Sequence, residues 1–379
     1  MERLIEVLTD CLREVERIGE SRSMHRSTNL SACVWRDDPA LHHNTRQLKA
    51  MSEGLGAQCT KLALLALRSP TEEYFESLFS EIIPQAQAFK IQFINFSNCS
   101  LSLPLLLIVC LPVRHFLKRM LELSESIKAG AYEDVSSITA KVHECAEAVK
   151  KVPETNKIAY KRAMMDKVAA INDVINEFAK HVAIYNNKYG DNADTNNEDN
   201  RNRVDESFDN DGDGDSGGGE EEEGEYTAEE VMVAEKCLKL ISHARDMLKV
   251  GISVSSEVAD ALHPLREETQ ETDETPASVF SSPTSSSEQR QCQEWVAKVL
   301  RETEVIETSV VDVGSELYDP LDNPGDVRKY YNTLFGNCAS YLQLVSGGNS
   351  RDVLGEETGA ALDRVSRAHC DEFEEWSEQ

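Results

Sequence analysis

Apolar residues recur every three or four positions along most of this chain, which is the feature that most restricts its fold. The most regular run alternates steps of three and four residues and comprises Val168, Ile171, Ile175, Phe178, Val182 and Tyr185. This period matches one face of an α-helix. No stretch shows the sustained apolar–polar alternation, bounded by turn residues, that is typical of β-strands. The sequence therefore predicts an all-α protein, with about six helices before residue 187 and four or five after residue 226.

The seam between residues 168 and 185 has two interpretations. Burial inside the first helical bundle is the favoured one, because several similar helices are available to cover it. The other is an exposed coiled-coil seam that joins two copies of the chain into a homodimer.

A long acidic run interrupts the helical pattern. Residues 191–230 contain 17 Asp and Glu against 2 Arg, a net charge of −15, while the whole chain has a net charge of −29. Such a run holds too few apolar residues to offset the entropy of ordering it. We therefore predict two helical bundle regions joined by a disordered acidic linker: an N-terminal bundle (1–186), the linker (187–226) and a C-terminal region (227–379) with a flexible loop (267–287). Thr227 and Glu230 have the spacing of a capping box and predict a helix start.

The distribution of charge and the spacing of the cysteines restrict the classes of function that this chain can have. The chain holds no cluster of four or more Lys or Arg, so direct binding to a phosphate backbone is not expected. None of the ten Cys forms a C-x-x-C pair, which indicates reduced, small apolar residues rather than a disulfide framework.

One apolar stretch, residues 101–113, resembles a membrane segment in composition. It has only 13 residues, including Pro104 and Pro112, whereas a membrane-spanning helix needs about 20. We therefore expect no membrane association and predict a buried apolar turn or a short helix start, followed by a helix from Val113. The composition of Asn95–Pro112 is also typical of a translated intron end, a hypothesis that contiguous transcript reads would refute.

The acidic run contains a formal match to the calcium loop of an EF-hand, formed by Asp209, Asp211, Asp213 and Glu220 with Gly214 between them. No amphipathic helix flanks this match. A run so rich in Asp, Gly and Glu produces it by composition, so we predict no metal site. No catalytic, nucleotide-binding or zinc-binding motif is recognisable either, and the expectation is a protein that is not an enzyme and needs no cofactor.

One segment carries a more specific pattern. Residues 142–157 read VHECAEAVKKVPETNK, and this resembles the central signature of the cyclin-D1-binding protein family, also called GCIP or HHM. The matching positions are Cys145, Pro153, Asn156 and Lys157. Pro153 should end one helix, and Thr155 or Asn156 should cap the next. The order of helical bundle, acidic interval and helical region is similar too.

The resemblance implies a cytoplasmic and nuclear regulator that restrains cell-cycle progression or transcription. Its implied partners are D-type cyclins and helix-loop-helix factors, bound in the manner of Id proteins, which lack a DNA-contacting basic region. Two alternatives remain open from the residues: a vinculin or α-catenin type of bundle adaptor, and a chaperone for basic proteins that uses residues 191–230.

Overall fold

The computed structural model describes residues 1–24, 39–68, 72–99, 101–189, 227–262, 286–317, 324–347 and 354–377. These residues form ten helices and no strand, which confirms the all-α prediction. The chain divides into two compact units. The first comprises Met1–Met164 with Val254–Leu300, and the second comprises Met165–Ser253 with Arg301–Gln379.

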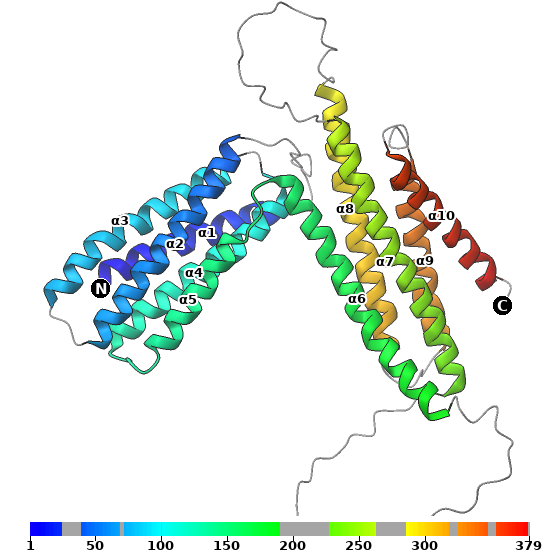
Figure 1. The fold of residues 1–379 in the computed structure, drawn as a ribbon, viewed down its shortest axis with the longest axis horizontal. Helices are drawn as coiled ribbons and strands as arrows, with labels where there is room; N and C mark the ends of the chain where they lie inside the picture. Colours follow the sequence, from blue (N-terminus) through cyan, green and yellow to red (C-terminus); the bar gives the residue numbers. More distant parts are fainter. Residues whose placement is uncertain are drawn as a thin grey trace, which may run out of the picture. The chain divides into compact units, whose positions relative to one another are not determined.

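The first unit is built on a bundle of five helices, shown in blue to green in Figure 1. They are α1 (Glu2–Met24), α2 (Pro39–Leu67), α3 (Glu72–Ser97), α4 (Leu103–Ala129) and α5 (Val135–Lys150). Helix α1 packs on α3 and α4, α2 packs on α3 and α5, and α4 packs on α5. Each helix therefore has a neighbour on both sides, and their apolar faces meet in one core.

The apolar stretch 101–113 is the first part of α4. Ser102 caps this helix, since its Oγ accepts a hydrogen bond from the Leu105 amide at 3.3 Å. Pro104 lies in the first turn, where its missing N–H costs nothing. The helix continues through Pro112, so the predicted turn with a new helix from Val113 was wrong. None of the described helices is long and apolar enough to span a bilayer.

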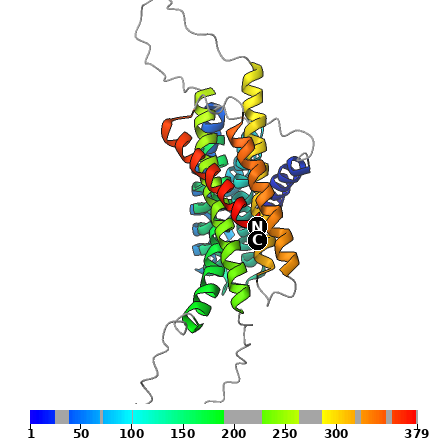
Figure 2. The ribbon, with the colours of Figure 1, turned by 90° about the vertical axis from the view of Figure 1, so that its right-hand side faces the viewer.

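The second unit takes its helices from both sides of the acidic run. Helices α6 (Asn156–Tyr189), α7 (Ala228–Leu262) and α8 (Ser286–Ser315) each contribute part of their length, and α9 (Pro324–Ser346) and α10 (Glu356–Ser377) complete it. These five helices are drawn in green to red in Figure 1 and, turned by 90°, in Figure 2.

The regular seam of α6 is buried in this second unit. Val168, Ile171 and Phe178 are each 1% exposed, and Phe178 lies directly against Gly314 of α8. Lys167 of the same helix pairs with Glu307 of α8, with Nζ and Oε2 2.6 Å apart. The seam is thus covered, but by a helix from the C-terminal part of the chain rather than within residues 1–186.

The predicted linker and loop lie largely outside the described residues. Helix α6 extends to Tyr189 and α7 begins at Ala228, so residues 190–226 are not described, and Asp209, Asp211, Asp213 and Glu220 fall among them. The same holds for residues 263–285. The predicted capping box is confirmed: the Thr227 amide donates to Glu230 Oε2 at 2.5 Å, and the Glu230 amide donates to Thr227 Oγ1 at 3.3 Å.

Candidate interaction surfaces

The family signature forms the turn between α5 and α6. Val152 is 3% exposed and Pro153 is also buried, so this turn is packed into the first unit. Thr155 caps α6, because its Oγ1 accepts a hydrogen bond from the Ile158 amide at 3.2 Å. Of the two predicted caps, Thr155 is therefore the one that acts locally.

Asn156 acts at long range instead. Its side chain is 1% exposed, and its Oδ1 accepts a hydrogen bond of 2.7 Å from the backbone amide of Ser102. Ser102 is the residue that caps α4. One buried amide side chain thus joins the α5–α6 turn to the start of α4 and satisfies a backbone N–H that would otherwise lose its partner on burial.

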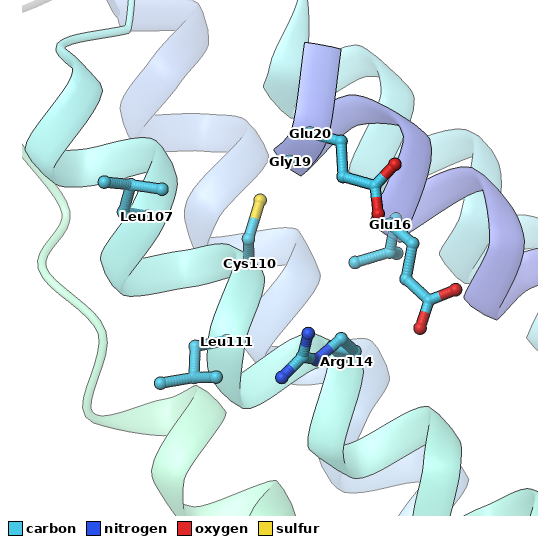
Figure 3. Close-up of a pocket in the computed structure, with 8 residues that line it drawn as sticks. Glu16, Gly19, Glu20, Leu107, Cys110, Leu111 and Arg114 are labelled. Carbon is cyan, nitrogen blue, oxygen red and sulfur yellow. The ribbon is translucent and has the colours of Figure 1, made fainter. Parts of the chain in front are cut away.

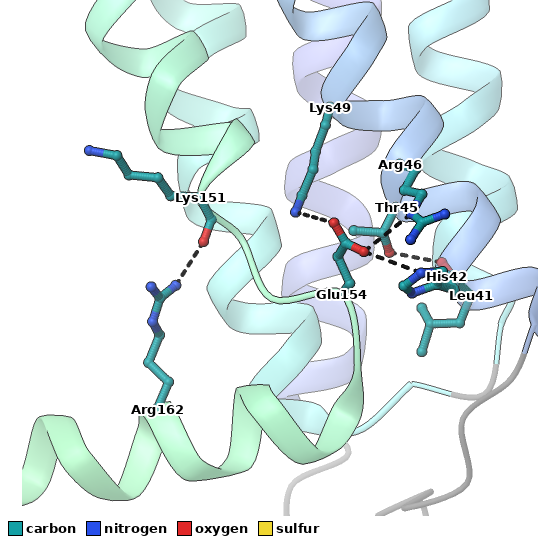
Figure 4. Close-up of polar contacts among 8 residues, drawn as sticks. All are labelled: Leu41, His42, Thr45, Arg46, Lys49, Lys151, Glu154 and Arg162. Carbon is teal, nitrogen blue, oxygen red and sulfur yellow. Dashed lines mark hydrogen bonds and ion pairs between the residues drawn. The ribbon is translucent and has the colours of Figure 1, made fainter. Parts of the chain in front are cut away.

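Glu154 ties the same turn to α2 (Figure 4). Its carboxylate lies 2.9 Å from Lys49 Nζ, 3.4 Å from Arg46 Nε and 3.3 Å from His42 Nε2. The hydrogen bond from Lys49, with the nearby positive charges, lowers the pKa of Glu154. On the other side of the turn, Arg162 of α6 donates to the Lys151 carbonyl at 3.0 Å.

Lys157 and Tyr160 connect the start of α6 to the end of α7. Lys157 forms an ion pair with Asp260, and the buried Tyr160 hydroxyl lies 3.5 Å from Ser255 Oγ. Cys145, the remaining signature residue, is half-buried, and burial raises the pKa of its thiol. The signature residues thus contact α2, α4 and α7, and the sequence offered no sign of Glu154 because its partners lie over 100 positions away.

A groove lies between α1 and α4 of the first unit (Figure 3). Its volume is about 260 Å³, and its lining comprises Val15, Glu16, Gly19 and Glu20 of α1 with Leu107, Cys110, Leu111 and Arg114 of α4. Leu107 is 37% exposed and Leu111 is 51% exposed. This groove was not predicted from the sequence, because the whole 101–113 stretch was expected to be buried.

The groove combines an apolar strip with charged groups, which are acidic on α1 and include Arg114 on α4. Leu107 and Leu111 lie one helical turn apart on α4, while Glu16 and Glu20 lie one turn apart on α1 (Figure 3). A concave surface with paired leucines and a charged rim is suited to an amphipathic helix of a partner protein. Among the described residues, no group of three or more His, Cys, Asp or Glu is arranged to hold a metal ion.

Comparison with known families identifies the central part of the chain. Residues 47–183 match the family model described as Grap2 and cyclin-D-interacting, N-terminal. This region is similar to the N-terminal part of the Grap2 and cyclin-D-interacting family. The match runs from α2 into α6 and includes Cys145, Pro153, Asn156 and Lys157, so it confirms the resemblance inferred from the signature. A search of curated proteins returned no match.

Proposed function

We propose that this chain is a non-enzymatic regulator that binds a D-type cyclin and thereby restrains cell-cycle progression, in both cytoplasm and nucleus. The observation that carries the proposal is the match of residues 47–183 to a cyclin-D-interacting family. A helix-loop-helix transcription factor is the second candidate partner, since such factors also present amphipathic helices.

The partner-binding surface in this proposal is the groove between α1 and α4. Its exposed Leu107 and Leu111 supply apolar area that no part of the described chain covers. Glu16 and Glu20 on the opposite wall favour a helix with a basic flank, because complementary charges at the rim fix orientation and increase the association rate.

The test measures binding of the purified full chain to a purified D-type cyclin by calorimetry. We expect Leu111→Asp to weaken binding at least about tenfold, since it places a charge at the centre of the contact. Leu64→Asp is the matched control: Leu64 lies on α2, away from the groove, and is 50% exposed, like Leu111. It should bind as the wild type does.

Two results would count against the proposal in different ways. Absence of binding to both D-type cyclins and helix-loop-helix factors would overturn the function itself. Equal weakening by Leu64→Asp and Leu111→Asp would overturn only the assignment of the groove. Affinity capture that recovers only actin-linked or junctional proteins would favour the bundle adaptor of the vinculin type, which the fold alone does not distinguish.

A further inference from the structure

Three basic side chains of α2 form a row that faces one carboxylate. His42, Arg46 and Lys49 follow steps of four and three residues, so they lie on one face of the helix. Their Nε2, Nε and Nζ atoms lie 3.3, 3.4 and 2.9 Å from the carboxylate of Glu154 in the α5–α6 turn (Figure 4). The folded chain thus already shows this row holding a carboxylate.

The basic groups at this place outnumber the carboxylate that they contact. Arg46 and Lys49 bring two positive charges to the single negative charge of Glu154. On the other side of the turn, Arg162 donates to the backbone carbonyl of Lys151, which is a neutral acceptor (Figure 4). We call Arg46, Lys49, Lys151 and Arg162 the turn cluster.

The turn cluster is open to solvent. The side chain of Arg46 is 65% exposed, and Lys151 and Arg162 are exposed as well. Ile158 lies one helical turn before Arg162 on α6 and is 52% exposed. A bound segment would therefore meet positive charges and one apolar side chain on the same surface.

The Glu154 side chain is not needed to hold the turn in place. Asn156 accepts its buried hydrogen bond from the Ser102 amide, and Pro153 is buried beside it in the turn. Ion pairs between exposed side chains contribute little to stability, and the Glu154 side chain is 29% exposed. Another carboxylate can therefore replace that of Glu154 while the backbone of the turn stays in place.

Charge complementarity defines the partner. The chain has a net charge of −29, but −15 of it lies in residues 191–230, and salt at physiological concentration screens exposed charges beyond about 8 Å. The local charge of the turn cluster therefore decides what binds there. A protein segment with several Asp or Glu can offer one carboxylate to the row on α2 and others to Lys151 and Arg162.

We propose that the turn cluster is a docking site for an acidic segment of a partner protein, in which a carboxylate of the partner takes the place of Glu154. The site lies on α2, the α5–α6 turn and α6, whereas the groove of the cyclin-binding proposal lies on α1 and α4. The two proposals are therefore independent.

The test measures binding of fluorescein-labelled hexaglutamate to the full chain by fluorescence anisotropy at physiological ionic strength. Glu154→Gln should raise the affinity at least about threefold, because it frees the row on α2. Lys49→Gln and Arg162→Gln should each lower the affinity at least about threefold, because each removes a charge that contacts the peptide. A folding defect would lower the affinity in every variant, so the increase in Glu154→Gln distinguishes a binding site from such a defect.

Lys61→Gln and Glu81→Gln are the matched controls. These two residues form an exposed ion pair between α2 and α3, with Nζ and Oε2 3.9 Å apart. Lys61 follows Lys49 by 12 residues on α2, about 18 Å at the helical rise of about 1.5 Å per residue, which exceeds the screening length. Both variants should bind hexaglutamate as the wild type does.

Equal affinities of the wild type, Glu154→Gln and Lys49→Gln would overturn the proposal, as would equal binding of hexaglutamine. Tighter binding of an oligodeoxythymidine than of hexaglutamate would assign the site to a phosphate backbone instead. Carbodiimide cross-links from Lys151 to residues 191–226 in the monomeric wild-type chain would also overturn it, because the occupant would then be the chain's own acidic run.

Discussion

At the scale of single residues, two neighbouring polar side chains of the signature hold the α5–α6 turn by different kinds of contact. The Asn156 side chain is 1% exposed and satisfies the Ser102 amide. Lys157, its neighbour in sequence, forms an ion pair with Asp260 whose two side chains are 30% and 55% exposed. Buried hydrogen bonds and exposed ion pairs differ in energy, because water competes with the second kind.

We expect Asn156→Ala to lower the free energy of unfolding by about 1–3 kcal/mol, because it leaves the buried Ser102 N–H without an acceptor. Lys157→Ala, the control in the same turn, should lower the free energy of unfolding by less than about 1 kcal/mol. Urea unfolding of the full chain, followed by circular dichroism, measures both. Equal losses for the two variants would contradict the structural role given to Asn156.

At the scale of elements, two helices approach each other closely where one of them carries a glycine. Gly251 of α7 lies against the Tyr341 hydroxyl of α9, and a Cβ at position 251 would overlap that hydroxyl. Tyr341 is fully buried, and burial raises the pKa of its phenol.

Gly251→Ala should therefore destabilise the second unit by about 1–3 kcal/mol through overpacking, although alanine is the better helix former. Gly336→Ala on α9 is the matched control, since an added Cβ there meets no atom within 4 Å. It should be neutral or stabilising by up to about 1 kcal/mol. Thermal unfolding midpoints measure the difference. A midpoint for Gly251→Ala equal to or above that of the wild type would show that Tyr341 moves aside freely.

We expect the docking of α10 to weaken as the pH falls below neutral. Burial lowers the pKa of His369 to about 4 in the folded chain, from about 6.5 when unfolded. Between these values the unfolded state binds more protons, so the stability contributed by docking of α10 is complete above pH 6.5 and is lost as the pH falls toward 4. Hydrogen exchange of residues 356–377, corrected for intrinsic rates, measures this. His369→Leu should remove the pH dependence of this exchange between about pH 4 and 6.5. If the variant kept the wild-type dependence, other groups would be responsible for it.

At the scale of the whole molecule, four of the described thiols, two in each unit, are distinguished from Cys370 by their burial. Burial raises the pKa of Cys11 to about 11 and those of Cys59, Cys237 and Cys338 to about 12, while Cys370 is exposed. Cys11 and Cys59 belong to the first unit, and Cys237 and Cys338 belong to the second.

We expect iodoacetamide at pH 8 to modify Cys370 in the native chain and the four buried thiols only in denaturant, because both access and the thiolate population control the reaction. Peptide mass spectrometry identifies the modified sites. If Cys59 and Cys338 were labelled in the native chain as fast as Cys370, these two thiols would not be buried in the cores of their units.

The helical character, the capping box and the family resemblance were all predictable from the sequence, because each depends on residues a few positions apart. Leu4, Leu8 and Cys11 repeat with the helical period and are buried as that period predicts. Thr227 and Glu230 satisfy each other's amides within one turn. The cap by Thr155 is equally local.

Only the tertiary structure decided which partners those helices meet. Asn156 bonds to a residue 54 positions away, and Glu154 pairs with residues 105 and 108 positions away. Within one apolar stretch, Leu106 is 1% exposed and Leu111 is 51% exposed. Helical periodicity assigns residues to faces, but which face is covered depends on the packing of distant segments. The groove, the covered seam of α6 and the buried His369 of α10 are therefore properties of the folded chain.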